Sequence, residues 1–368
     1  MEVGEKVAER FHVEAFIGAG GMGAVYRAKD EHTGAVVALK SLLRADGDNE
    51  RFARESRLLA ELHHPGIVPY VAHGVTMSGE RWLAMQWLEG EDLAERLDRS
   101  GLNLADALEV VRCAADALAA AHARGVVHRD VKPSNLFLEG GDPSRVRLLD
   151  FGIARDAGVA RATLTGAVLG TPGYMAPEQA RGEANVGPSA DVFSLGCVAF
   201  ECLTATRPFV ADHALAVILR IVLEDAPRPR DRRADIPEDL DTLIYEMLAK
   251  NAADRPRDAA EVATRLAAIG AMPPSMRSRT LHLGPQPSLT EGEERLVSLV
   301  VAAAIRRAPS PDTLGTAATL GTAAALGTAA TVSTAPELVS AGGSERPAPA
   351  LPGNVRVHDD ALAAWQRI

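Results

Sequence analysis

One short segment of this 368-residue sequence concentrates groups that can do chemistry. It reads His128-Arg129-Asp130-Val131-Lys132-Pro133-Ser134-Asn135, and Asp150-Phe151-Gly152 follows it. An aspartate can accept a proton and a lysine can offset negative charge. Carboxylate and amide oxygens are the ligands that hard cations such as Mg²⁺ prefer. The segment therefore combines a candidate base, a cation and two candidate metal ligands, Asn135 and Asp150.

A glycine-rich segment upstream, Gly18-Ala19-Gly20-Gly21-Met22-Gly23, fits the pattern G-x-G-x-x-G. Dinucleotide-binding folds use this pattern at a strand-to-helix turn. Here only six residues separate Gly23 from the turn-like segment 30–34, and residues 25–28 have β character, so there is no room for a helix. We predict a hairpin loop whose backbone N–H groups can lie over phosphates. An ordinary glycine-rich hairpin is the alternative.

Two charged residues in the elements that follow form a candidate pair. Lys40 ends the predicted strand 36–40, and Glu55 lies on the apolar stripe of a predicted helix at 49–62. A carboxylate that faces inward needs a cation because an unpaired buried charge is costly, and Lys40 is the candidate. The alternative places Glu55 at the edge of the stripe, paired in water with Arg51 or Arg54.

The later elements must hold the polar segment in place. A long amphipathic helix is predicted over 104–124, with His122 as a packed or capping residue and Gly125 as the stop signal. Ser189 is predicted to cap a buried helix that contains Asp191.

Composition limits the classes of function. The formal net charge of −10 argues against a nucleic-acid surface. The three cysteines stand singly without metal-ligand spacing, which suits reduced thiols in a cytoplasm. The segment 296–305 is the longest apolar run of the C-terminal part and is about half of the roughly 20 residues that a membrane span needs. We therefore expect a cytoplasmic protein without a membrane span.

Together these motifs resemble those of a Hanks-type (eukaryotic-like) bacterial serine/threonine protein kinase. The glycine-rich loop, Val37-Ala38-Leu39-Lys40, Glu55, the segment 128–135, Asp150-Phe151-Gly152 and Ala176-Pro177-Glu178 occur in the expected order. The resemblance covers residues 11–268. It implies an α+β, two-lobed fold with a small antiparallel sheet lobe at about 11–88, which carries one helix, and a mainly helical lobe at about 89–268.

The resemblance also implies an activity, cofactors and site residues. The γ-phosphoryl group of MgATP would be transferred to Ser or Thr hydroxyls of protein substrates in signal transduction, with Mn²⁺ as the alternative metal. Asp130 would accept or orient the substrate hydroxyl, Lys132 would offset charge on the phosphoryl group, and Lys40, oriented by Glu55, would hold the α- and β-phosphates. Asn135 and Asp150 would bind the metal. The ATP-binding residues would be Ile17, Gly18, Ala19, Gly20, Gly21, Met22, Gly23, Val25, Ala38, Lys40, Met85, Gln86 and Leu88.

Regulation is implied by Arg129, which precedes the catalytic aspartate. In the family this arginine accompanies an activation loop that phosphorylation orders, since a phosphate forms charge-assisted bonds to it. Thr171 resembles the threonine that contacts Asp130 and Lys132 and helps to read the substrate. Thr163 and Thr165 remain as candidate autophosphorylation sites, for which a homodimer could serve. Asp191 resembles the aspartate that holds the catalytic loop, and the arginine of Asp254-Arg255-Pro256 resembles the late arginine that pairs with Glu178.

Composition changes after residue 268. Prolines and serines predict a linker at 269–292. Residues 293–368 begin with a strand-like segment and continue into an Ala-, Thr- and Gly-rich repeat, which we interpret as a low-complexity tail. The entry to this part resembles that of a cyclase-like or signalling module. Two competing hypotheses follow: a kinase-like scaffold without activity, which Lys40, Asp130 and Asp150 argue against, and a kinase with a working cyclase, which we do not expect.

Overall fold

The computed structural model describes residues 1–20, 23–42, 49–151, 172–269 and 280–281. The chain divides into two compact units, Met1–Ala308 and Pro309–Ile368. The second unit lies outside the described residues, as do the predicted tail at 293–368 and its cyclase-like entry.

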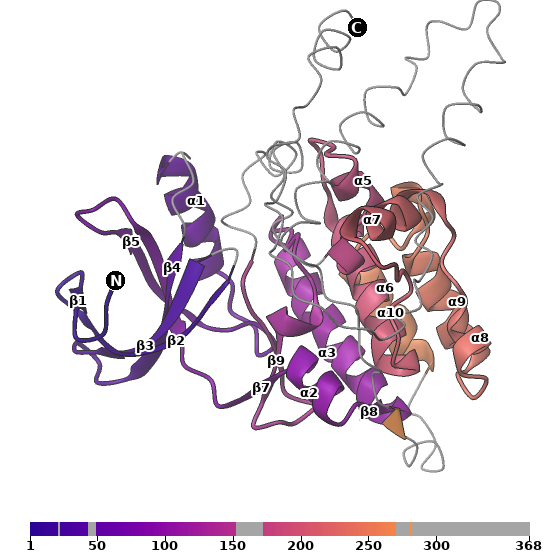
Figure 1. Cartoon of the computed structure of the whole chain (residues 1–368), viewed down its shortest axis with the longest axis horizontal. Coiled ribbons are helices and arrows are strands. Elements are labelled where there is room, and N and C mark those ends of the chain that lie inside the picture. Colours follow the sequence, from indigo (N-terminus) through magenta and orange to yellow (C-terminus); the bar gives the residue numbers. More distant parts are fainter. Residues whose placement is uncertain (21–22, 43–48, 152–171, 270–279, 282–368) are drawn as a thin grey trace, which may run out of the picture. The chain divides into compact units, whose positions relative to one another are not determined.

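The N-terminal part is an antiparallel sheet with one helix (Figure 1). The strand order is β1-β2-β3-β4-β6-β5. The strands are β1 Lys6–Val7, β2 Phe11–Gly20, β3 Gly23–Asp30, β4 Val36–Leu42, β5 Tyr70–Val75 and β6 Arg81–Gln86, and the helix is α1 Asn49–Ala60. The glycine-rich segment lies at the β2–β3 connection, as predicted, because Gly20 pairs with Gly23.

The two faces of this sheet have different partners. Val37 and Leu39 of β4 are buried in a cluster with Phe11 and Ala84. Side chains alternate along a strand, so Lys40 belongs to the opposite face. The sheet therefore packs one face into its own core and leaves the other to the rest of the chain.

The C-terminal part is mainly helical. Short strands β7 Gly90–Asp92, β9 Leu136–Glu139 and β10 Val146–Leu148 form a small sheet, and β8 Leu102–Asn103 pairs with β11 Thr280–Leu281. The helices are α2 Leu93–Arg99, α3 Leu104–His122, α5 Pro177–Ala180, α6 Pro188–Thr204, α7 Ala214–Leu223, α8 Pro229–Arg232, α9 Glu238–Met247 and α10 Ala259–Ile269. Three 3₁₀ turns complete the described part: η1 Pro133–Asn135, η2 Pro172–Tyr174 and η3 Ala252–Asp254. The predicted α+β, two-lobed fold is confirmed.

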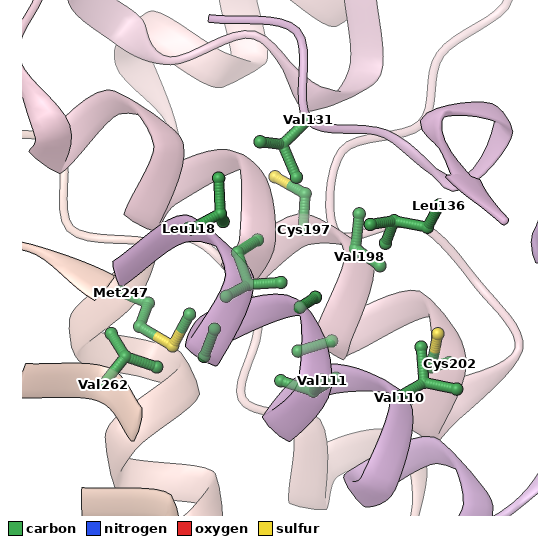
Figure 2. Packing of buried hydrophobic residues seen from close by; sticks show 14 of the residues in the cluster. Val110, Val111, Leu118, Val131, Leu136, Cys197, Val198, Cys202, Met247 and Val262 are labelled. Atoms are coloured by element: carbon green, nitrogen blue, oxygen red, sulfur yellow. The ribbon is translucent and has the colours of Figure 1, made fainter. Parts of the chain in front are cut away.

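Helix α6 lies at the centre of the larger lobe and is buried from Ala190 to Thr204. Its apolar side chains face α3, α9 and α10. Val131, inside the 128–135 segment, and Leu136, directly after it, insert beside Cys197 and Val198 of α6 (Figure 2). Both are almost completely buried, so apolar packing fixes this polar loop at two points.

Several predicted boundaries need correction. Helix α1 ends at Ala60 and α3 at His122, each two residues before the predicted end. Ser189 is not the cap of α6, because the helix begins at Pro188 and Gly187 occupies the cap position. The proline is accommodated in the first turn, where its missing N–H costs no helical hydrogen bond.

Candidate active site

The catalytic-loop candidate Asp130 is held by two neighbours from its own loop. Lys132 Nζ lies 3.0 Å from Asp130 Oδ2. Asn135 Nδ2 donates to the same oxygen at 3.0 Å and to the Asp130 carbonyl at 2.7 Å. Because Lys132 and Asn135 fix the orientation of the Asp130 carboxylate, this group can accept a proton from a hydroxyl placed against it.

The backbone of the loop is fixed by a buried carboxylate on α6. Asp191 Oδ2 accepts the His128 N–H and Asp191 Oδ1 accepts the Arg129 N–H, each at 2.7 Å. Nε2 of His122 also lies within hydrogen-bond distance of Asp191 Oδ2, at 2.8 Å. The other ring nitrogen of His122, Nδ1, accepts the Ala259 N–H at the start of α10. His122 therefore caps the start of α10, and the predicted role of Asp191 as a holder of the loop agrees with these contacts.

His128 joins this loop to the segment that bears Asp150. Its Nδ1 accepts the Asp130 N–H at 3.2 Å, so the proton lies on Nε2, which donates to the Leu149 carbonyl at 2.7 Å. The side chain is fully buried, and burial lowers the pKa of His128. Neutral His128 thus fixes Asp130 relative to the residue that precedes Asp150.

Asn135 and Asp150, the two candidate metal ligands, are brought together by the backbone. The Leu149 N–H donates to the Asn135 carbonyl at 2.9 Å. The amide nitrogen of Asn135 faces Asp130, which leaves its oxygen as the atom that suits a cation. Asp150 has φ +51°, a left-handed conformation that non-glycine residues seldom adopt. An oxygen donor set of this kind fits Mg²⁺.

Lys40 reaches this metal-ligand pair from the small lobe. Its Nζ lies 2.7 Å from Asp150 Oδ2, and the lysine side chain is 9% exposed. Glu55 is half-buried and, with Arg54 of α1, lines a cavity of about 170 Å³ that Arg129 and Phe151 also border. The predicted pairing of Lys40 with Glu55 stays a prediction.

The glycines of the loop serve two different purposes. A Cβ atom at Gly18 or Gly20 would meet no atom within 4 Å, so a bound group can approach the backbone there. At Gly23, which has φ +140°, a Cβ would lie 1.8 Å from the Ser41 carbonyl oxygen. Gly23 is therefore required by strand packing, whereas Gly18 and Gly20 leave the open surface that fits phosphates. Ala19 pairs with Ala24 beside them, and Gly21 and Met22 lie outside the described residues.

The predicted nucleotide-binding residues of the strands share one face of the sheet. Val25 lies directly opposite Lys40, and Ala38 lies opposite Met85. Directly opposite residues of antiparallel strands project to the same side, so these four side chains form one surface. Met85 packs in a cluster with Leu88, Val68 and Leu83. Ile17 is 52% exposed in β2, and Gln86 is exposed at the end of β6.

Sequence reasoning missed one contact of the catalytic loop. Gln179 Nε2 of α5 donates to the Arg129 carbonyl at 2.9 Å, while its Oε1 accepts the Ala176 N–H. Arg129 has φ +64°, so this carbonyl belongs to a left-handed residue. The signal in the sequence was the glutamine next to Ala176-Pro177-Glu178, which a short helix start places beside the loop.

A second missed cluster lies beneath η2. The Tyr174 hydroxyl donates to Glu201 Oε2 at 2.5 Å, and Arg207 Nε lies 3.4 Å from Glu201 Oε1. Burial raises the pKa of Glu201 and that of Tyr174. No pattern in the sequence linked these residues, because Tyr174 in η2 lies 27 residues before Glu201 in α6.

The expected pair of Glu178 and Arg255 is present and buried. Arg255 donates to both carboxylate oxygens of Glu178 at 2.8 Å. It also donates to the carbonyls of Ala249, Ser189 and Lys250. These bonds attach α5, and through Gln179 the catalytic loop, to the core of the larger lobe.

The phosphorylation candidates cannot be placed. Thr163, Thr165 and Thr171 lie outside the described residues. No helix in the described ranges has the length and apolar character required to cross a bilayer.

Comparisons with known proteins agree with this geometry. A family model described as the protein kinase domain matches residues 11–265. Serine/threonine-protein kinase pkn3 of Myxococcus xanthus is 37% identical over 73% of this chain and 51% of its own length. Serine/threonine-protein kinase PknA of Mycobacterium tuberculosis is 40% identical over 74% of this chain and 64% of its own length. The chain thus spans about half to two thirds of the length of these two curated relatives.

A solved structure shares the fold. The crystal structure of Rad53 1-466 in complex with AMP-PNP has a TM-score of 0.58 and 24% identity, and it covers 70% of this chain and 64% of the Rad53 chain. With the matched domain model and the bacterial relatives, the chain belongs to the protein kinase family, as a Hanks-type member similar to bacterial serine/threonine-protein kinases.

Proposed function

We propose that this chain is a serine/threonine protein kinase that transfers the γ-phosphoryl group of MgATP to Ser or Thr hydroxyls of proteins in bacterial signal transduction. The observation that carries the proposal is the network from Asp130 to Lys40. Asp130 is oriented by Lys132 and Asn135, Asn135 is bonded to the backbone beside Asp150, and Asp150 pairs with Lys40. This network collects a base, two cations and two oxygen ligands in one place.

Each group has a distinct task in phosphoryl transfer. Asp130 orients the substrate hydroxyl and accepts its proton, and Lys132 offsets negative charge beside it. Asn135 and Asp150 would hold Mg²⁺, which when bound supplies positive charge between the phosphates. Lys40 would leave Asp150 for the α- and β-phosphates, while Gly18 and Gly20 offer open backbone for phosphates.

The nucleotide proposal has independent support from the sheet. Val25, Ala38 and Met85 form an apolar surface on the same face as Lys40. An apolar wall next to a cation suits a ligand with a flat base and a charged tail. The Rad53 neighbour is titled as a complex with AMP-PNP, an ATP analogue, which supports ATP as the nucleotide.

The proposal is tested by labelling with radioactive ATP. Purified wild-type chain should label itself and a general protein substrate, and Asp130→Asn and Lys40→Met should reduce labelling by about 10²-fold or more. The exposed Lys29→Met is the matched control and should label as wild type does. Equal labelling by wild type and Asp130→Asn would show a kinase-like scaffold instead.

We further propose that Thr163 and Thr165 are autophosphorylated by a second copy of the chain. The cavity between α1 and the catalytic loop supports phosphorylation of this segment, because Arg54 and Arg129 both line it. Guanidinium pairs are suited to phosphate. Wild-type chain should phosphorylate an added Asp130→Asn chain of different size, and labelling confined to the wild-type band would exclude reaction between copies.

We propose a cytoplasmic location, where ATP is supplied. Cys113, Cys197 and Cys202 carry free thiols in the structure, which suits a reducing compartment. Fractionation of cells that express the full chain tests the location.

A further inference from the structure

The predicted linker contains a strand that pairs with the larger lobe. Thr280 lies opposite Asn103 and Leu281 opposite Leu102, in an antiparallel ribbon of β11 and β8 (Figure 1). In the picture the orange arrow of β11 lies against β8 at the start of α3. Proline- and serine-rich sequence gave no reason to expect this contact.

The ribbon provides hydrogen-bond partners for the buried backbone of β8. Leu102 is 1% exposed, and Gly101 and Leu104 on either side are buried too. Buried backbone N–H and C=O groups must find partners, since an unpaired one costs as much as a lost hydrogen bond. β11 is the strand that pairs with β8, so the segment after α10 supplies partners for this edge.

The path of the chain leads to this edge. Helix α10 begins beside the last residue of α3, because the Ala259 N–H donates to His122 Nδ1, and it packs along α3. Its 11 residues cover about 16 Å on the way back toward the start of α3. Residues 270–279 can then span up to about 33 Å, which is ample to reach β8.

Strand β8 directly follows helix α2, which contacts the catalytic loop. β8 follows α2, and α2 packs against η1, the turn that contains Asn135. α2 is in turn capped by Asp92, the last residue of β7. A strand that fixes β8 therefore fixes one end of α2.

We propose that β8 is a docking edge for residues 280–281 of the same chain, and that this docking clamps α2 against the catalytic-loop turn. The catalytic unit would then extend through Leu281 and not end with α10. The evidence for the docking is the strand pairing alone. The proposed effect of the clamp on the catalytic loop rests, in addition, on the proposed kinase function.

A disulfide trap tests the docking. Opposite residues of antiparallel strands have Cα atoms about 4.5–5.5 Å apart, within the range that a disulfide spans. In a Cys113→Ala background, Asn103→Cys with Thr280→Cys should form a cross-link within one chain under mild oxidation. Asn103→Cys with Ser298→Cys is the control and should cross-link far less. A cross-linked dimer would assign the edge to a second copy and overturn docking within the chain, and absence of any cross-link would also overturn it.

Hydrogen exchange of the intact chain gives a second measurement. Leu281→Pro removes a backbone N–H and should speed exchange of the 101–104 amides by about tenfold or more. Gln286→Pro places the same change outside the ribbon and should leave these rates unchanged. Equal rates in Leu281→Pro and wild type would overturn the docking. This measurement needs no kinase activity, so its failure is separate from failure of the proposed function.

The clamp has its own readout. If docking holds α2, Leu281→Pro should speed exchange in 93–99 and raise the KM for ATP by about threefold or more, with a smaller change in kcat. Gln286→Pro should change neither. An unchanged KM together with faster exchange at 101–104 would retain the docking and overturn the clamp.

Discussion

Lys40 Nζ lies 2.7 Å from Asp150 Oδ2, so a strand of the small lobe is tied directly to the candidate metal ligand. In this arrangement the two charges neutralise each other. Both residues belong to the proposed phosphate site. Binding of MgATP must therefore separate the two side chains or engage both of them.

The first prediction concerns this pair. Lys40→Met and Asp150→Asn should each lower kcat/KM by about 10²–10³-fold, because each removes charge stabilisation of the transferred group. The double variant should lose little more than either single variant, since groups that act as a unit are not additive. Steady-state kinetics with a peptide substrate measure this. Fully additive losses would contradict a shared role.

The second prediction concerns activation. Thr163→Ala with Thr165→Ala should lower activity by about tenfold or more, because no phosphate could then join Arg129 to α1. Thr264→Ala, an exposed threonine in α10, is the control. Phosphosite mapping of active wild-type chain should find phosphate on Thr163 or Thr165, and a fully active chain without it would contradict the assignment.

The third prediction concerns Asp191. In Asp191→Asn one of the two oxygens becomes an NH₂ group that faces a backbone N–H donor, so a hydrogen bond becomes a repulsion. We expect a loss of about 3 kcal/mol in unfolding free energy, together with loss of activity. Asp239→Asn, an exposed acid in α9, should cost little. Urea titration followed by circular dichroism measures both.

The fourth prediction concerns the buried pair of Arg255 and Glu178. Lysine cannot reproduce the bidentate contact and the three carbonyl contacts, so Arg255→Lys should cost about 2–3 kcal/mol of unfolding free energy. The neighbouring Arg257 is 81% exposed, and Arg257→Lys should be almost neutral. Similar losses for the two variants would mean that the buried geometry has no energetic value.

The fifth prediction concerns acid. Burial lowers the pKa of His128 below its usual 6.5, so the unfolded chain binds more protons than the folded chain in the window below about pH 6.5. The stability that neutral His128 contributes is complete above that window and is lost as the pH falls through the lowered pKa. Between pH 7 and pH 5 the unfolding free energy of wild type should fall more steeply than that of His128→Asn.

Exposed His12 provides the control for this comparison, and His12→Asn should follow the wild-type slope. Parallel curves for His128→Asn and wild type would assign the acid sensitivity to other groups.

The sequence was sufficient for the two-lobed fold and for several of its elements. Glycine spacing predicted the β2–β3 hairpin, and the apolar pattern predicted α1 and α3 to within two residues at their ends. Short-range physics decides these features: strand alternation, helix periodicity and the space available between turns.

Contacts between distant segments were harder to predict. The position of Gln179 next to Ala176-Pro177-Glu178 does not by itself identify the Arg129 carbonyl as its partner, and Tyr174 gives no sign of a bond to Glu201. Whether Lys40 pairs with Glu55 or with Asp150 depends on how α1 and the Asp150 segment are arranged around it. The same sequence is compatible with more than one such arrangement. Periodicity placed Glu55 on the inner stripe, but the structure leaves it half-buried beside Arg54.

The position of Asp191 determines whether substitutions near it reduce the amount of folded protein in a cell or only its activity. One carboxylate anchors the catalytic loop and also belongs to α6, a helix that is buried over almost its whole length, so a substitution at Asp191 should destabilise the lobe and disable the site together. Substitutions around α6 should therefore be recovered as low-abundance, degraded protein, whereas substitutions of Asp130 should give abundant but inactive protein.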